Sequence, residues 1–268
     1  MTIEPEEIAN NFLEIASELR LNVLLSLNKK PSSLSNLAKE IDVTASELHR
    51  NLGRLQKADL IRKHVDGEYH LTLYGRTVCA QIPIFEFMLQ NKKYFEGHDF
   101  ANLPSKFIQR SGALVQSEMV NGYAKVTEKW KNIYKNAQEY IHNILVDIPY
   151  NADLLEILED RLNHGIKIKS VFSESSIIPK ERQEILSKFD FKKFIKDEVL
   201  ERKMEKDVKI VLVLNEKEAG ISFPTSDGEA DISKMLYSTD KSFHEWCFDY
   251  FRERWDLASR FQEDKLEH

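Results

Sequence analysis

The order of signals along the first ninety residues constrains the fold most. Apolar residues recur at helical spacing in four stretches, and Pro83 lies inside the last of them. Thr44 with Glu47 three residues later forms a capping box that opens the third stretch. Asp66-Gly67 joins two short strand-like runs and is a strong hairpin signal. The sequence therefore predicts helices over 8–27, 33–41, 45–58 and 74–90, a tight connection at 42–43, and strands over 61–65 and 68–73.

Helix, helix, tight turn, helix, hairpin and helix is the layout of an α+β winged helix-turn-helix domain, which we expect over 1–90. The charge distribution fits a nucleic-acid partner. Residues 20–76 carry ten Lys and Arg against six Asp and Glu, whereas the segments on either side are net acidic. A local positive face is what DNA binding needs, even in a chain of net charge −6. The alternative is an interaction or scaffold protein that uses its winged helix for protein contacts.

The layout also predicts which side chains would contact double-stranded DNA. The recognition helix of such a domain enters the major groove with its N-terminal residues nearest the base edges. Arg50 is the best candidate for reading guanine, because its planar fork matches the O6 and N7 acceptors. The wing would contact phosphates or the minor groove. The predicted DNA-binding residues are Thr44, Ser46, His49, Arg50, Arg54, Arg62, Lys63, His64 and Tyr69.

Composition excludes several other classes. A hydrophobic fraction of 42% over 268 residues supports a real core, so a disordered chain is excluded. No apolar run approaches the roughly 20 residues of a membrane span, and the acidic start lacks a signal-peptide core, so we expect a cytoplasmic protein without membrane contact. Cys79 and Cys247 lie too far apart in sequence to suggest a disulfide framework or a cysteine-based zinc site. The ending 266–268 resembles the start of a cloning tag and is set aside.

The remainder of the chain changes in periodicity at about residue 144. Turn chemistry over 91–105 and helical spacing up to about residue 144 predict a helical linker or dimer segment over 91–140. Strand-like and helix-like runs then alternate, which predicts an α/β effector domain with a mixed sheet over 141–265. The predicted strands cover 144–148, 166–172, 207–214 and 219–223, and the predicted helices cover 153–164, 179–189 and 240–262.

Several of these segments resemble known regulators. The run Leu34-x-x-Leu-Ala-x-x-Ile-x-Val-Thr-x-Ser-x-Leu-x-Arg-x-Leu-x-x-Leu55, followed by Asp59-Leu60-Ile61, resembles ArsR/MarR-type regulators, with Asp59 where those carry Gly. Two further segments resemble archaeal regulators first associated with methanogenesis and filament formation. They are Tyr94-Phe95-x-x-His98-Asp99-x-x-x-Leu-Pro104 with Arg110 and Leu114, and Ser242-Phe243-His244-x-Trp246-Cys247-x-Asp249-x-Phe251-x-x-x-Trp255. The resemblance implies a winged helix fused to a phospholipase-D-like sensor domain, as in TrmB-type sugar regulators.

That fold includes hydrolases, so we searched the sequence for their nucleophile. Phospholipase D chemistry needs His-x-Lys, and no histidine of this chain has a lysine two positions later. The glycine-rich and metalloprotease motifs of other enzyme classes are also missing. His98-Asp99 could form an acid/base or metal pair, but a packed histidine beside an Asp that bonds local backbone is the preferred interpretation. We therefore expect a protein that is not an enzyme, with no cofactor and no metal site.

The predicted function is a transcriptional regulator, a homodimer because operators of this kind are palindromic. The helices over 8–27 and 74–90 carry more apolar surface than one small domain needs. Ligands of open α/β sheets bind outside the carboxyl ends of strands, which suggests an unidentified small-molecule effector there. The predicted effector-binding residues are Tyr150, Ser173, Glu174, Tyr237 and Trp246. Operator sequence, activation or repression, and effector identity are left open.

Overall fold

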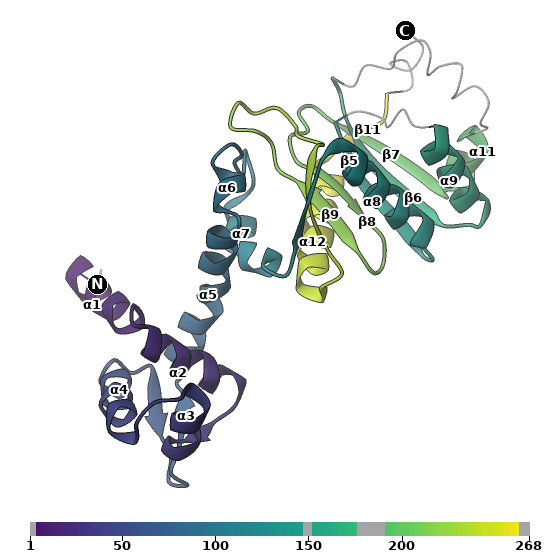
Figure 1. Ribbon diagram of the computed structural model, residues 1–268. Helices are drawn as coiled ribbons and strands as arrows, with labels where there is room; N and C mark the ends of the chain where they lie inside the picture. Colours follow the sequence, from purple (N-terminus) through teal and green to yellow (C-terminus); the bar gives the residue numbers. More distant parts are fainter. Residues whose placement is uncertain (1–3, 147–151, 176–190, 263–268) are drawn as a thin grey trace. The chain divides into compact units, whose positions relative to one another are not determined.

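The computed structural model describes residues 4–146, 152–175 and 191–262 (Figure 1). The chain divides into two compact units, Met1–Pro83 and Ile84–His268. The division falls inside one helix, α5 (Leu73–Gln90), which contains Pro83. Within the described part of the chain, no helix is long and apolar enough to span a membrane.

The N-terminal unit is a winged helix. Its helices are α1 (Pro5–Ile15), α2 (Glu18–Lys29), α3 (Leu34–Ile41), α4 (Ala45–Lys57) and the first part of α5. Its strands are β1 (Ser32–Ser33), β2 (Ile61–Lys63) and β3 (Glu68–Leu71), in the order β1-β3-β2 with antiparallel pairing throughout. Gly67 turns the hairpin with φ +87°, a conformation that favours glycine.

Two local features fix the helix-turn-helix. Asp42 ends α3 in the left-handed region, with φ 60°, and this turns the chain sharply towards α4. Thr44 Oγ1 accepts the Glu47 N–H at 3.2 Å, as the capping box predicts. Beneath them lies one core of fully buried side chains, contributed by every helix from α2 to α5 and by the wing. Its members include Val23, Leu24, Leu37, Leu48, Leu52, Leu55 and Leu60.

The C-terminal unit is built on an eight-stranded mixed sheet of order β11-β7-β6-β5-β8-β9-β10-β4. Strands β5 (Tyr140–Leu145), β6 (Lys167–Ser173) and β7 (Leu200–Glu205) pair in parallel. The antiparallel members are β4 (Glu118–Asn121), β8 (Val211–Leu214), β9 (Ala219–Ser222), β10 (Lys234–Ser238) and β11 (Ser259–Arg260).

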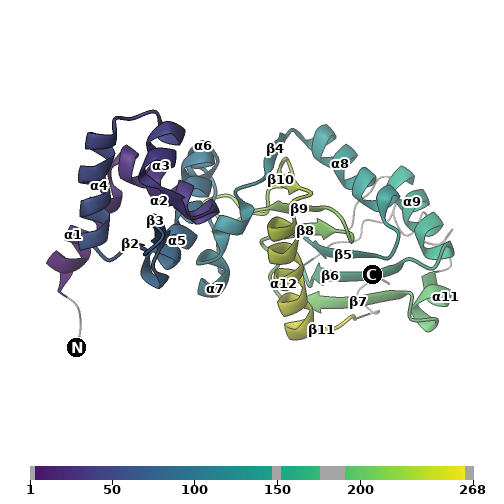
Figure 2. The same ribbon diagram turned by 90° about the horizontal axis from the view of Figure 1, so that it is seen from below.

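The two faces of this sheet carry separate cores. Helix α12 (Lys241–Leu257) covers one face, where Trp246 and Phe243 are fully buried together with Phe87 and Phe107. Helices α8 (Tyr123–Asn136) and α9 (Ala152–Asn163) cover the other face, where Trp130 packs (Figure 2). Shorter helices complete the unit, namely α6 (Lys92–Phe95), α7 (Ser105–Ile108), a 3₁₀ turn over Ser111–Leu114, and α11 (Phe191–Lys196).

Three element predictions were wrong. The single helix over 8–27 is two helices, α1 and α2, which break at Ala16-Ser17. The helical stretch up to 144 ends at Asn136, and residues 140–145 form β5 in the centre of the sheet. The helix over 240–262 stops at Leu257, after which β11 joins the edge of the sheet. The helix predicted over 179–189 lies outside the described residues.

The segment 91–105 is not a free linker but part of the C-terminal unit's core. His98 is buried, with Nδ1 2.8 Å from the Tyr94 carbonyl oxygen and Nε2 2.9 Å from Asp231 Oδ2. Asp99 Oδ1 accepts the Ala101 N–H at 2.7 Å. The preferred interpretation of His98-Asp99, a packed histidine beside an aspartate that bonds local backbone, is confirmed.

Candidate nucleic-acid interface

Helix α4 is amphipathic in a way that leaves a polar face to solvent. Leu48, Leu52 and Leu55 are fully buried on one side. Because residues three and four apart share a helix face, the remaining positions gather on the other side. Ser46, His49, Arg50 and Arg54 are all exposed there. The amide groups and positive dipole end of the first turn lie beside Thr44, the exposed cap residue.

Arg50 and Arg54 differ in what they bind within the protein. The Arg50 guanidinium makes no hydrogen bond or ion pair with any residue the structure describes. Arg54 is engaged in a fork with Glu14 of α1, with Nε–Oε2 at 2.9 Å and Nη2–Oε1 at 2.7 Å. The hydrogen bond from Arg54 lowers the pKa of the Glu14 carboxyl, and Glu14 in turn raises the pKa of Arg54. Arg54 must leave this pair before it can contact a base.

The sequence did not predict a buried polar contact between α2 and α4. Arg20 of α2 is 6% exposed; it donates Nη2 to the Leu13 carbonyl at 2.8 Å and Nη1 to Asn51 Oδ1 at 3.4 Å. Asn51, a polar residue of α4, is buried. The signal was present, because Asn51 lies three residues after Leu48 and four before Leu55, within the apolar stripe.

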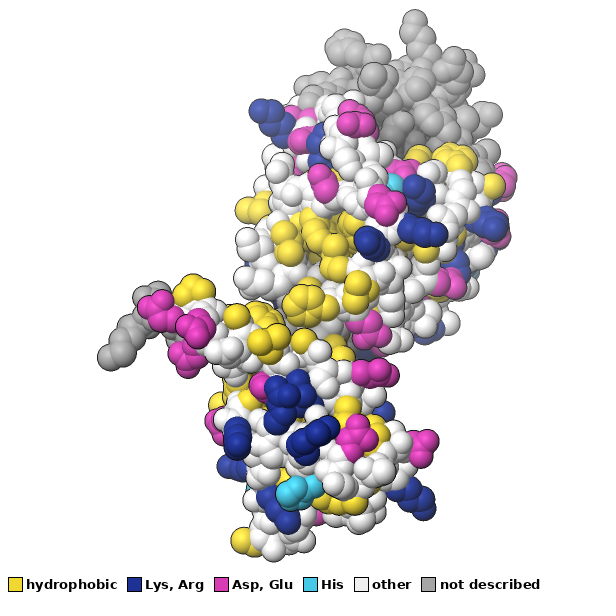
Figure 3. All heavy atoms as spheres, turned by 60° about the vertical axis from the view of Figure 1, so that its left-hand side comes forward, with side chains coloured by type: hydrophobic (Ala, Val, Ile, Leu, Met, Phe, Trp, Pro, Cys, Tyr) yellow, Lys and Arg dark blue, Asp and Glu magenta, His cyan; other side chains and the backbone are white. Residues whose placement is uncertain are grey.

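The wing presents only part of what the sequence predicted. Arg62 and Lys63 of β2 are exposed, and His64 is half-buried and stacks on His70 with ring centroids 3.9 Å apart. Tyr69 is 3% exposed because it points inward from β3 into the core. Its prediction as a DNA contact was therefore wrong. Figure 3 shows Lys and Arg side chains gathered on the N-terminal unit, in the lower part of the view, with a histidine among them.

The predicted effector residues are not brought together. Trp246 is fully buried on the α12 face, where its Nε1–H donates to the Phe107 carbonyl at 3.1 Å. Tyr237 of β10 packs on the opposite face, and its hydroxyl donates to Glu218. Ser173 ends β6, which is separated from β10 by three intervening strands. Glu174 follows it, and Tyr150 lies outside the described residues. Tyr237 and Trp246 therefore do not line one hollow, because they pack in the cores on opposite faces of the sheet.

A shallow hollow does exist elsewhere in the C-terminal unit, between α8 and α9. Charged side chains line it, and Lys131 is paired there with Asp153 at 2.8 Å. None of the predicted effector residues contributes to this hollow. Its lining is Glu128, Lys131, Lys135, Asp153, Glu156, Ile157, Asp160 and Arg161.

The comparison with protein families gives a match in the N-terminal part of the chain. Residues 11–91 match the model of a family described as the HVO_A0261 N-terminal domain. This match begins within α1 and covers the rest of the winged helix and all of α5. No curated protein matches the chain.

Three solved structures are similar to this chain at low sequence identity. TrmBL2, titled an archaeal chromatin protein with a novel mode of DNA binding, is 15% identical, with 91% of this chain and 94% of that chain covered and a TM-score of 0.40. The phospholipase D family member Nuc from Salmonella typhimurium is 10% identical over 55% of this chain and 99% of that one, at 0.40. NucT from Helicobacter pylori is 12% identical over 52% and 92%, at 0.39.

Proposed function

We propose that this chain is a DNA-binding transcriptional regulator. The observation that carries the proposal is the exposed face of α4, where Arg50 has no partner within the described chain and stands beside Ser46 and His49 at the start of a capped helix. A helix of this kind fits the major groove of B-DNA, which is about 12 Å wide. The match of residues 11–91 to a domain family supports treating this unit as one module.

Each exposed residue has a distinct role in the proposed complex. Arg50 reads a guanine through two parallel N–H donors, and Ser46 and His49 contact neighbouring base edges. Thr44 bonds a phosphate at the helix start, where the dipole favours negative charge. Arg62 and Lys63 of the wing neutralise phosphates and so hold the register without reading sequence. Arg54 is paired with Glu14 and contacts DNA only after that ion pair opens.

Fluorescence anisotropy tests the proposal directly. The full chain is titrated into a labelled duplex from the DNA upstream of its own gene and into a scrambled duplex of equal length, at several salt concentrations. We expect tighter binding to the upstream duplex and an affinity that falls steeply with salt, because bound phosphates release counterions. Equal, salt-insensitive and weak binding to both duplexes would instead favour the protein-contact alternative.

Dimerisation is part of the proposal and rests on exposed apolar side chains. Ile8, Phe12 and Leu13 of α1 are 47%, 55% and 61% exposed, and Leu73 at the start of α5 is 73% exposed. The two helices are neighbours, because the Tyr74 hydroxyl donates to Asn11 Oδ1 at 3.4 Å. A second copy of the chain would cover this surface and supply two recognition helices for a palindromic site.

Light scattering tests the dimer. Phe12→Lys should shift the mass at micromolar concentration from dimer to monomer, because a charge would be buried in the interface. Val65→Lys is the matched control, since Val65 is an equally apolar, fully exposed residue at the tip of the wing. A wild-type chain that is monomeric at micromolar concentration contradicts the proposal.

Effector sensing by the C-terminal unit is the third and most specific part of the proposal. The C-terminal unit is a complete α/β fold whose core is independent of the winged helix, and we assign it a sensing role rather than a catalytic one. Of the predicted effector-binding residues, Ser173 is the last residue of the parallel strand β6, and Glu174 follows it. A thermal-shift screen of central metabolites on the full chain tests this, with about 2.7 kcal/mol of stabilisation expected at a hundredfold excess over Kd.

A further inference from the structure

One face of the wing carries a row of side chains that DNA binding does not explain. Asp66, Glu68 and His70 alternate along the turn and β3, so their side chains project to the same side of the hairpin. Across the hairpin, His64 donates its backbone N–H to the Glu68 carbonyl at 2.8 Å and lies on the same side. Two carboxylates on a hairpin that is proposed to approach phosphate would repel it, which calls for another role.

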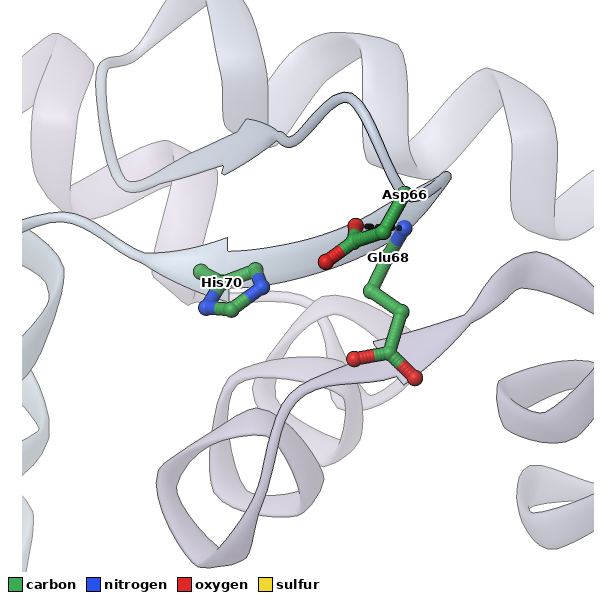
Figure 4. Close-up of side chains that lie close together, drawn as sticks. All are labelled: Asp66, Glu68 and His70. Carbon is green, nitrogen blue, oxygen red and sulfur yellow. Dashed lines mark hydrogen bonds between the residues drawn. The ribbon is translucent and has the colours of Figure 1, made fainter.

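The three side chains of β3 and its turn converge in space. One carboxylate oxygen each from Asp66 and Glu68 and one ring nitrogen of His70 all lie within 4.8 Å of one another (Figure 4). Asp66 Oδ1 is held in place by the Glu68 N–H at 2.9 Å, which orients that carboxylate. The arrangement is thus set by the turn and by the strand, not by flexible side chains alone.

The imidazoles supply an independent observation. His64 and His70 stack at 3.9 Å, and the Nε2 atom of each ring is buried without a hydrogen-bond partner in the described chain. Buried polar atoms are nearly always satisfied, so an orphaned imidazole nitrogen needs an explanation. A neutral imidazole offers one ring nitrogen as a lone-pair donor, and histidine is the commonest metal ligand among side chains.

We propose that this face of the wing binds a divalent transition-metal ion of the zinc type, with Asp66, Glu68 and His70 as ligands and His64 beside them. Mixed nitrogen and carboxylate ligands suit zinc, whereas magnesium and calcium take oxygen ligands. Ligands of a tetrahedral zinc ion at about 2.1 Å lie about 3.4 Å apart, so the side chains close on the ion by about 1 Å. Asp66 is exposed and Glu68 half-exposed, so this movement costs little packing.

A bound cation would change the charge of the hairpin, where Arg62 and Lys63 otherwise balance Asp66 and Glu68. Arg62, opposite His70 in the register, is exposed and can turn its guanidinium away from the ion. The ion would neutralise the two carboxylates, so that Arg62 and Lys63 dominate the field of the wing.

Calorimetric titration of Zn²⁺ into the chelator-treated full chain, prepared without an affinity tag, tests the site. We expect one saturable site per chain, and Co²⁺ in its place should give the visible absorption of a nitrogen- and oxygen-ligated ion. Glu68→Gln and His70→Gln should each weaken Zn²⁺ binding at least tenfold, because each removes a ligand while keeping side-chain volume.

His164→Ala is the matched control, since His164 is an exposed histidine paired with a carboxylate, Asp160, on another part of the chain. It should leave the affinity unchanged. Far-UV circular dichroism and thermal melting verify that each variant is folded, and Glu68→Gln remains decisive should His70→Gln unfold. The absence of a stoichiometric site, wild-type affinity in Glu68→Gln, or loss of the site in His164→Ala overturns the proposal.

Discussion

At the scale of single residues, variants of Arg50 and Lys63 distinguish base contacts from phosphate contacts in the proposed DNA complex. Arg50→Ala should cost about 1–3 kcal/mol at the specific site and relax the sequence preference, because a bidentate guanine contact is lost. Lys63→Ala should weaken all duplexes alike and reduce the salt slope by about one. Anisotropy titrations over a salt series, on specific and scrambled duplexes, measure both effects. An Arg50→Ala chain with wild-type specificity would refute the recognition-helix assignment.

The pairing of Arg54 with Glu14 makes a second prediction. Glu14→Gln removes the charge that holds Arg54 and lowers the negative charge beside α4. The released guanidinium should add one phosphate contact, which strengthens DNA binding and raises the salt slope by about one. Glu40→Gln, an exposed glutamate of α3, is the control for loss of charge alone. Equal effects of the two variants would show that Arg54 gains no new contact.

His142 carries a pH prediction for the C-terminal unit. Burial, and then the charges of Lys169 and His244, lower its pKa to about 3. The unfolded chain protonates this imidazole near pH 6.5, whereas the folded protein keeps the His142 ring neutral down to about pH 3. The neutral ring therefore makes its full contribution to the free energy of unfolding above about pH 6.5. It is lost as the pH falls towards 3, at up to about 1.4 kcal/mol per pH unit.

The variant His142→Phe tests this. The ring stacks between Tyr140 and Phe251, at 4.4 and 4.3 Å, and its Nδ1 is buried without a partner, so a phenyl ring fits the site. Urea unfolding followed by circular dichroism at pH 7 and pH 5 should show a smaller loss of stability in the variant than in the wild type. The same loss in both proteins would assign the acid sensitivity to other groups.

At the scale of elements, the winged helix was predicted well because each of its helices and turns carries a signal within its own sequence. The capping box, the Asp-Gly turn and the apolar stripe of α4 all lie within a few residues of the structure they specify. The break between α1 and α2 has a cause further along the chain: the Arg20 side chain binds the Leu13 and Glu14 carbonyls that a continuous helix would use. The partners of Arg54 and Arg20 depend on packing between helices, which periodicity does not show.

Strand β7 shows why half of the sheet was missed. Its sequence, Leu-Glu-Arg-Lys-Met-Glu, reads as a polar segment. Its charges are satisfied in the folded unit, where Glu201 pairs with Lys169 and Lys203 donates to the Trp255 carbonyl. Strands β4 and β10 are short and near the sheet edge, and they pair with each other although they come from distant parts of the chain. Strand formation in such segments depends on their neighbours in the sheet more than on their own sequence.

Gly75 of α5 gives a prediction at this scale. A Cβ at this position would lie 2.0 Å from the Leu60 carbonyl oxygen, a backbone atom that cannot move aside. Gly75→Ala should therefore destabilise the winged helix by at least about 3 kcal/mol, the upper end of the usual range for overpacking. Gly53→Ala in α4, where nothing lies within 4 Å, should instead stabilise by about 0.5–1 kcal/mol. Hydrogen exchange of the β2 and β3 amides measures both.

At the scale of the whole molecule, the chain joins two units with separate cores, and the two were not equally predictable. The α/β character of the C-terminal unit followed from the alternation of strands and helices. The positions of individual side chains in it did not, since a binding site at strand ends depends on strand order and face. Trp246 illustrates this: an aromatic residue in a distinctive motif proved to be the centre of a core.

The distribution of tryptophan gives this architecture a built-in optical label. Trp130, Trp246 and Trp255 all belong to the C-terminal unit, and the sequence of the winged helix contains none. Intrinsic emission excited selectively in tryptophan thus records only the α/β unit and is blind to events confined to α4 or the wing. A spectral change on addition of an unlabelled duplex would consequently be a direct signal that occupancy of one unit is felt in the other.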